Sequence, residues 1–202
     1  MTVAIVTLDG FNEVDTFVAA TILGRVQRPN SGVVIASPTP TVTSMNGITV
    51  SAHISCDELP SADGVIVGSG RRTREFADDA AFLQRLLLDP RRQLVGAQCS
   101  GALLLARLGL LEGVPVCTDA ATTPWLTEAG FDVVNRPFTA TGNTATAGGC
   151  LASQYLASWM IARWWGVDLA REALRSVAPT GEEDDYVKRA MRHVLSTMTG
   201  AR

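Results

Sequence analysis

The apolar residues of this chain gather in short runs that alternate with stretches of helical periodicity. Residues 3–8 are almost continuously apolar, which is typical of a strand covered on both faces in a parallel sheet. Apolar positions then recur at helical spacing through residues 13–26, and a second strand-like run follows at residues 32–37. Because a strand, a helix and a strand in this order build a parallel sheet, the pattern predicts an α/β fold.

Two segments break this pattern and predict hairpins. Alternating runs flank Asn46-Gly47 within residues 41–54, which indicates an antiparallel hairpin beside the main sheet. A second turn at Gly142-Asn143 joins short runs at residues 138–141 and 144–146. The remaining elements are predicted as strands at 64–67, 93–98, 114–117 and 131–134, and as helices at 77–88, 102–107, 123–129, 151–165, 168–177 and 183–198. Without a repeat or a linker, residues 1–202 are expected to form one three-layer, flavodoxin-like domain with a mainly parallel sheet.

Charge and hydropathy restrict the partners that we expect. The 202 residues carry 17 basic and 20 acidic side chains without a block of one sign, which gives no electrostatic reason to bind nucleic acid or an anionic membrane. No basic residue precedes the first apolar run, so we expect no signal peptide. The apolar stretch 155–165 contains Arg163 and is too short to span a bilayer.

The cysteines and histidines are dispersed. Four cysteines stand at wide spacings, which favours a reducing cytoplasm over a disulfide framework. The only histidines are His53 and His193, and neither is clustered with cysteine. We therefore expect a cytoplasmic protein with no metal ion and no cofactor.

One cysteine stands at the junction of a predicted strand and a predicted helix. Strand 93–98 leads through Cys99-Ser100-Gly101 into helix 102–107. A sharp strand-to-helix turn at a nucleophilic residue is a nucleophile elbow. It leaves the Cys99 sulfur beside unpaired N–H groups at the positive end of the helix dipole, which favours the thiolate.

The loops after neighbouring parallel strands supply candidate partners for Cys99, because they meet at one edge of the sheet. The first loop carries Glu13, expected to be solvated, and Asp15. A protonated carboxyl group at Asp15 would donate a hydrogen bond to the sulfur, and the pair would titrate as a unit. The loop after the third main strand carries Ser69 and Gly70, whose backbone, with the Ser100 N–H, is a candidate oxyanion site.

These motifs together resemble the ThiJ/PfpI superfamily, a branch of the class I glutamine-amidotransferase-like fold. The resemblance covers nearly the whole chain. It rests on the opening strand, Asp15, Val67-Gly68-Ser69-Gly70, Gln98-Cys99-Ser100-Gly101 and Thr146-Ala147-Gly148-Gly149. It implies a hydrogen bond between Asp15 and Cys99, a small-molecule substrate and a homodimer.

Two departures from the family pattern narrow the function. Peptidase-like members carry histidine where Ser100 stands, and many glyoxalase-like members carry histidine where Asp119 stands. A protease or amidase is therefore disfavoured. The branch that works without histidine is similar to isonitrile hydratase, which implies that Cys99, Asp15 and Ser100 hydrate an isonitrile to an N-formamide. The alternatives are a non-catalytic redox or electrophile sensor, a stress-response protein, a ligand-sensing domain and a glyoxalase-like enzyme.

Several side chains near the predicted site have a structural explanation as well as a functional one. The Ser100 hydroxyl is either a catalytic group or a helix-capping group. Asp119 is expected to cap the segment that follows it. Arg71 and Arg72 either face an anionic ligand or lie on the surface, and a surface position is expected. The other three cysteines are expected to be structural, namely Cys56, Cys117 and Cys150.

Overall fold

A seven-stranded sheet forms the centre of the protein in the computed structural model, which describes residues 1–198. Its strand order is β5-β2-β1-β6-β7-β9-β8, and every neighbouring pair is parallel except β8 with β9. The strands are β1 (Thr2–Val6), β2 (Gly32–Ser37), β5 (Ile54–Ser55), β6 (Gly64–Val67), β7 (Leu94–Gln98), β8 (Phe138–Thr141) and β9 (Thr144–Ala147). The expectation of a mainly parallel α/β sheet is confirmed.

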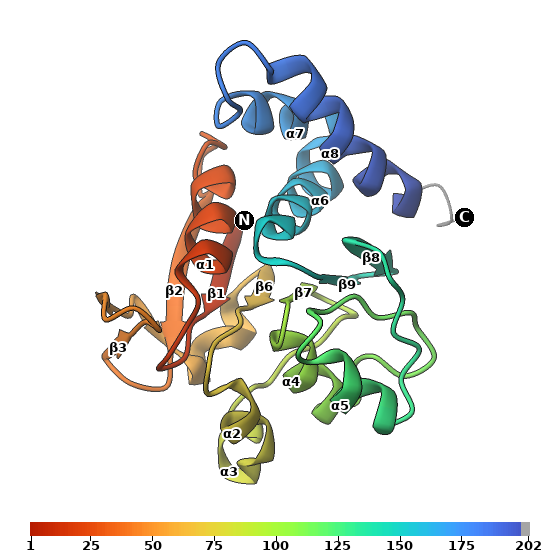
Figure 1. The fold of residues 1–202 in the computed structure, drawn as a ribbon. Helices are drawn as coiled ribbons and strands as arrows, with labels where there is room; N and C mark the ends of the chain where they lie inside the picture. The colour runs from red at the N-terminus through yellow and green to blue at the C-terminus, as the bar shows by residue number, and fades with distance from the viewer. Residues whose placement is uncertain (199–202) are drawn as a thin grey trace.

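Helices cover both faces of the sheet, so the fold has three layers (Figure 1). One face is covered by α1 (Glu13–Leu23), α6 (Ser153–Trp165), α7 (Val167–Arg175) and α8 (Glu183–Met198). The other is covered by α2 (Thr73–Asp78), α3 (Ala80–Leu83), α4 (Gly101–Arg107) and α5 (Thr123–Glu128). Along β1, Val3 and Ile5 enter the first core while Ala4 and Val6 enter the second, as the two-residue period of a strand requires. This double burial explains the continuous apolar run in the sequence.

Both predicted hairpins form. Strands β3 (Thr41–Thr43) and β4 (Thr49–Ser51) make a separate two-stranded antiparallel sheet, and β8 with β9 closes one edge of the main sheet. Ile54 was predicted as the end of the first hairpin but pairs instead with β2, as the first residue of β5.

Three predicted elements differ from the structure. The predicted helix 77–88 is replaced by the short helices α2 and α3, because Asp79 adopts an extended conformation and accepts hydrogen bonds from the Ala81 and Phe82 N–H groups. The predicted strands 114–117 and 131–134 are wrong. Within the described residues, these two segments share a single parallel bridge between Val116 and Val133.

The carboxyl ends of β1, β6, β7 and β9 lie side by side at one edge of the sheet. Their loops continue into α1, α2, α4 and the 3-10 turn η2 (Cys150–Ala152), which precedes α6. Four segments that are distant in sequence therefore meet at one place. Among residues 1–198, no helix has the length and hydrophobicity that a membrane span requires.

Candidate active site

Cys99 occupies the turn between β7 and α4 in a strained conformation. Its φ is +48°, and among the described residues Asn30 is the only other non-glycine residue with a positive φ. The left-handed region costs an L-residue roughly 1–2 kcal/mol, so the surrounding structure must hold it there. The Cys99 N–H donates to the Ala147 carbonyl at 2.8 Å, and the Thr118 hydroxyl donates to the Cys99 carbonyl at 2.8 Å. The predicted nucleophile elbow is therefore present.

Gly101 allows the elbow helix to approach the neighbouring strand. A Cβ at this position would lie 2.3 Å from the Val67 carbonyl oxygen, inside any tolerable contact. The missing side chain lets α4 begin directly over the end of β6. This close approach sets the position of Cys99 relative to the loop after β6.

Asp15 brings a carboxyl group to the sulfur from the first turn of α1. Asn12 caps this helix, with its side chain accepting a hydrogen bond from the Val14 N–H. The Asp15 side chain is only 1% exposed, and its Oδ2 accepts a hydrogen bond from the Ser69 hydroxyl. Its Oδ1 has no hydrogen-bond partner in the described part of the chain. Burial raises the pKa of Asp15 to about 6, against the opposing effects of the Ser69 hydroxyl and the nearby thiols.

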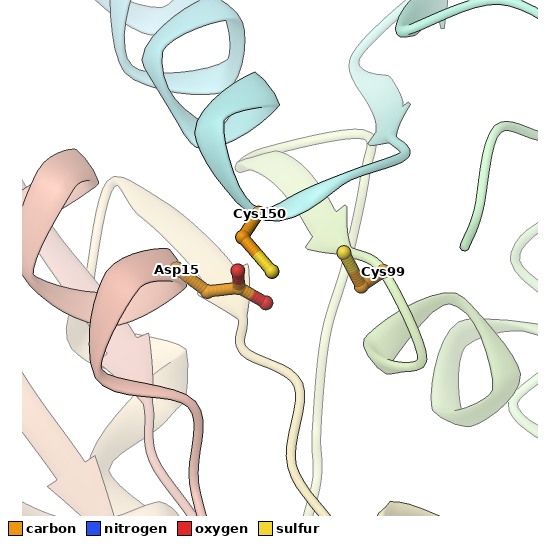
Figure 2. A group of neighbouring side chains, drawn as sticks. All are labelled: Asp15, Cys99 and Cys150. Carbon is orange, nitrogen blue, oxygen red and sulfur yellow. The ribbon is translucent and has the colours of Figure 1, made fainter. Parts of the chain in front are cut away.

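Cys150 completes a cluster with Asp15 and Cys99. One carboxylate oxygen of Asp15 and the two sulfurs all lie within 4.8 Å of one another, and Figure 2 shows the three side chains converging from α1, the elbow and η2. The Asn12 amide donates to the Cys150 sulfur at 3.2 Å. The expectation that Cys150 is structural is corrected. Its place directly after Gly148-Gly149, a segment that carries the family resemblance, was the signal that could have identified it.

The elbow alone predicted a thiolate at Cys99, but the surroundings of the sulfur favour the protonated thiol. Burial, together with the negative charge of Asp15, raises the pKa of the Cys99 thiol, while a hydrogen bond from the Gln98 amide to the sulfur (3.4 Å) lowers it. A thiolate and a carboxylate this close repel each other, so ionisation of one disfavours ionisation of the other. At neutral pH the single negative charge of the pair therefore lies on Asp15, and Cys99 is held as the thiol.

Ser69, Gly70 and Ser100 border the cluster, although their predicted roles stay predictions. The Ser100 hydroxyl makes no helix-capping hydrogen bond. It donates to the Thr73 hydroxyl at 3.0 Å and accepts from the Gly70 N–H at 3.4 Å. The Ser69 hydroxyl is engaged with Asp15. Ser100 thus stands at the N-cap position of α4, as expected, but its hydroxyl ties the elbow to the loop after β6 rather than capping the helix.

A pocket of about 350 Å³ opens over Cys99, Ser100 and Cys150. Its walls include Met45, Arg71, Arg74, Asp119 and Trp125. The Arg74 guanidinium lies 4.7 Å from the centre of the Trp125 ring, a cation–π contact. Arg71 is exposed, as expected, but it also lines this pocket.

Arg72, Glu13 and Asp119 have structural partners. Arg72 pairs with Asp9 and Glu75 at the surface. Glu13 is half-buried rather than solvated and accepts a hydrogen bond from the Asn46 amide at 3.0 Å. Asp119 accepts from the Ala121 and Thr122 N–H groups, which confirms the expected cap.

Neither histidine reaches the pocket. His53 accepts a hydrogen bond from the Ile35 N–H at 2.9 Å, and the His193 ring lies 5.0 Å from the Tyr155 ring. Neither lies among the residues that line the pocket. The acid–base side chain beside Cys99 is therefore the Asp15 carboxyl group and not a histidine.

The cluster also has the donors of a metal site. Two sulfurs and a carboxylate oxygen within 4.8 Å of one another are close enough to bind one ion. Sequence analysis expected no metal because it considered only clusters of cysteine and histidine. The cluster was not visible in the sequence because its members come from three distant segments.

The fold and site define an α/β protein with a cysteine at a nucleophile elbow and an acidic residue beside it. The DJ-1/PfpI family model matches residues 1–163, and the chain belongs to this family. Comparison with curated protein sequences gave no significant match.

Solved structures with the same fold come from eukaryotes and bacteria. DJ-1 of Schizosaccharomyces pombe is 15% identical with a TM-score of 0.76, and the alignment covers 89% of this chain and 100% of that one. A ThiJ/PfpI family protein from Pseudomonas syringae is 18% identical with a TM-score of 0.77, with 98% and 89% covered. An AraC family transcriptional regulator from Pseudomonas putida is 22% identical with a TM-score of 0.76, with 88% and 99% covered. At these identities the likeness concerns the fold alone.

Proposed function

We propose that this protein is a cysteine-dependent enzyme that hydrates a small isonitrile to the N-formamide. The observation that carries the proposal is the buried Asp15 carboxylate within 4.8 Å of the sulfur of Cys99, which lines a pocket without histidine. An isonitrile carbon accepts both a proton and a nucleophile, so one acid–base group beside one nucleophile is sufficient.

In the first step, sulfur and hydrogen add to the same carbon. The Asp15 carboxylate takes the thiol proton of Cys99 and delivers it to the isonitrile carbon, while the sulfur forms a bond to that carbon. The product is a thioimidate on Cys99, and no oxidant or metal is consumed. The pKa of Asp15 near 6 suits this transfer, because the group is then largely ionised at neutral pH and still a competent acid.

In the second step, water releases the product. Asp15 acts as the base for water attack on the thioimidate carbon, and the nitrogen is protonated. The carbon–sulfur bond then breaks to give the N-formamide, and the sulfur regains its proton. The Gly70 and Ser100 N–H groups are the proposed donors to the oxygen on the thioimidate carbon. In the structure the Gly70 N–H donates to the Ser100 hydroxyl at 3.4 Å, so it would exchange this partner for the substrate oxygen.

The pocket suggests a preference among isonitriles. Met45 and Trp125 supply apolar surface, and Arg71 and Arg74 form no ion pair within the described chain. We infer that an isonitrile with an apolar body and an anionic substituent binds best, since a cation beside an aromatic ring recognises that combination.

The direct test is formation of N-formamide from alkyl and carboxyalkyl isonitriles. The wild type should turn over. Cys99→Ala should be inactive, and Asp15→Asn should lose roughly two to four orders of magnitude in rate, the range for an acid–base group. Cys117→Ala removes a buried thiol outside the pocket and should keep wild-type activity. Absence of wild-type turnover with every isonitrile would refute the proposal.

We also propose a cytoplasmic homodimer. All four cysteines are free thiols, which suits a reducing compartment. Apolar side chains are exposed on adjacent elements, with Val14 and Phe17 on α1 and Leu151 on η2. A second copy covering this surface would bury it, and it would lie next to Cys150 and the pocket.

A further inference from the structure

Cys99 and Cys150 approach each other across the active-site pocket. Their sulfurs lie within 4.8 Å, and Figure 2 shows both sulfurs turned into the space between the two side chains. Both residues line the pocket, so a small solute that reaches one also reaches the other. The remaining cysteines differ, because Cys56 and Cys117 are fully buried in the core outside the pocket.

The hydration chemistry gives Cys150 no role. Its thiol is nevertheless partly accessible, next to a carboxylate and hydrogen-bonded by the Asn12 amide at 3.2 Å. Burial and the Asp15 charge raise the pKa of the Cys150 thiol, while the hydrogen bond from the Asn12 amide lowers it. This thiol therefore needs a nearby base to take its proton when it attacks.

We propose that Cys150 is a resolving cysteine, which converts a sulfenic acid on Cys99 into a reversible Cys99–Cys150 disulfide after reaction with a hydroperoxide. The inference does not rest on isonitrile hydration, because it requires only that Cys99 react with peroxide. It assigns this site an oxidative cycle in addition to its addition chemistry.

The chemistry balances in two steps. In the first, the Cys99 sulfur attacks the hydroperoxide, the O–O bond breaks, and the thiol proton leaves with the departing oxygen as water or an alcohol. The sulfur is oxidised by two electrons and the peroxide is reduced. In the second, the Cys150 sulfur attacks the Cys99 sulfenic acid, an S–S bond forms, and hydroxide leaves with the Cys150 proton as water. A dithiol then restores both thiols.

Asp15 can serve both steps as the local proton carrier. Its carboxylate lies within 4.8 Å of both sulfurs, so it accepts the proton of the attacking thiol and returns it to the leaving oxygen. The sulfurs must close to about 2.05 Å. Cys150 lies at the start of a single 3-10 turn and follows Gly149, which is exposed and has a φ of +87°. Side-chain rotation and a small backbone adjustment at Gly149 can supply the approach, while Cys99 stays fixed by the elbow.

The test is mild oxidation followed by intact mass measurement and thiol counting in denaturant. Wild type treated with two equivalents of hydrogen peroxide, the amount that a sulfinic acid consumes, should lose two hydrogens and two of its four thiols, as a monomer on non-reducing gels, and dithiothreitol should restore both. Cys150→Ala should instead gain two oxygens on Cys99, a sulfinic acid that dithiothreitol does not reverse. Cys117→Ala should form the disulfide as the wild type does.

The opposite pattern would overturn the inference. If the wild type also accumulates sulfinic acid, with the same yield as Cys150→Ala, Cys150 does not resolve Cys99. Circular dichroism of Cys150→Ala checks its fold, and Cys150→Ser provides a second variant that is closer in size. Isonitrile turnover by the reduced protein is measured in parallel. Its absence would leave the disulfide result intact, so the two proposals fail separately.

Discussion

The Asp15 carboxylate and the Cys99 sulfur lie within 4.8 Å of each other, and the carboxylate is buried while the sulfur is held at a strained turn. Only one of these two acidic groups is ionised at neutral pH, because a second charge would be repelled in a poorly solvated site, and the raised pKa of the Cys99 thiol leaves that charge on Asp15. The reactive form is therefore produced by moving a proton within the pair. Changes to Asp15 should alter the pH behaviour of stability, thiol reactivity and turnover together.

Stability should depend on Asp15 in a specific pH window. Its pKa is raised from 3.8 to about 6 in the folded protein, so the folded state binds more protons than the unfolded state between these values. Stability is then lost as the pH rises from about 4 to 6, by up to about 3 kcal/mol. Asp15→Asn should remove this loss and be the more stable protein at pH 7. Urea unfolding across pH 4–7.5 measures it, with the exposed Asp132→Asn as control. Parallel pH profiles for wild type and Asp15→Asn would contradict the prediction.

The alkylation rate of Cys99 reports the repulsion directly. The charge of Asp15 contributes to the raised pKa of the Cys99 thiol, so Asp15→Asn should lower that pKa and speed reaction with iodoacetamide at pH 8 by about tenfold. The comparison is made in a Cys150→Ala background, so that Cys99 is the only pocket thiol labelled. Slower alkylation of the Asp15→Asn protein would show that the carboxylate activates the thiol rather than opposing its ionisation.

Removing the Ser69 hydroxyl should shift the pH profile of turnover. Its hydrogen bond to Asp15 stabilises the carboxylate, so Ser69→Ala should raise the Asp15 pKa further. The acidic limb of the kcat/KM profile for isonitrile hydration should then move to higher pH. Ser44→Ala is a matched control, because it removes a hydroxyl that donates to Glu13 at the hairpin. If Ser44→Ala shifted the acidic limb of the kcat/KM profile by the same amount, the shift would not depend on the hydrogen bond between Ser69 and Asp15.

The elbow should tolerate no side chain at position 101. Gly101→Ala places a Cβ 2.3 Å from the Val67 carbonyl oxygen, and overpacking against backbone should cost about 2 kcal/mol or more. Gly32→Ala is the control, because nothing lies within 4 Å of its added Cβ. Thermal unfolding of both variants tests the difference. Equal melting temperatures would mean that α4 does not depend on this close approach.

The proposed dimer predicts a position-dependent effect of charge. Leu151→Glu, in the exposed patch beside α1, should convert the dimer to a monomer in light scattering. Leu87→Glu is matched to it, because Leu87 is 61% exposed and Leu151 67% exposed, and Leu87 follows α3 on the other face of the sheet. Leu87→Glu should leave the association state unchanged. A wild-type protein that is monomeric at micromolar concentration would refute the dimer.

The sequence by itself determined the sheet and the elbow. Continuous apolar runs and Gly-rich strand ends are local signals, and they placed Cys99, Asp15 and the loop after β6 at one edge. Prediction from the sequence was wrong where contacts with other segments determine the secondary structure. Residues 114–117 look like a strand but find one bridging partner, and Asp79 divides an apparently continuous helix by accepting two backbone hydrogen bonds.

Only the tertiary structure decided the chemistry of the cluster. Burial of Asp15, which raises its pKa, depends on packing between α1 and the loop after β6, and no local pattern encodes it. Cys150 became part of the site because β9 lies beside β7, which brings the start of η2 over the elbow. Distances between side chains from separate segments are set by strand order and helix packing, so a lone cysteine in the sequence became half of a dithiol in the fold.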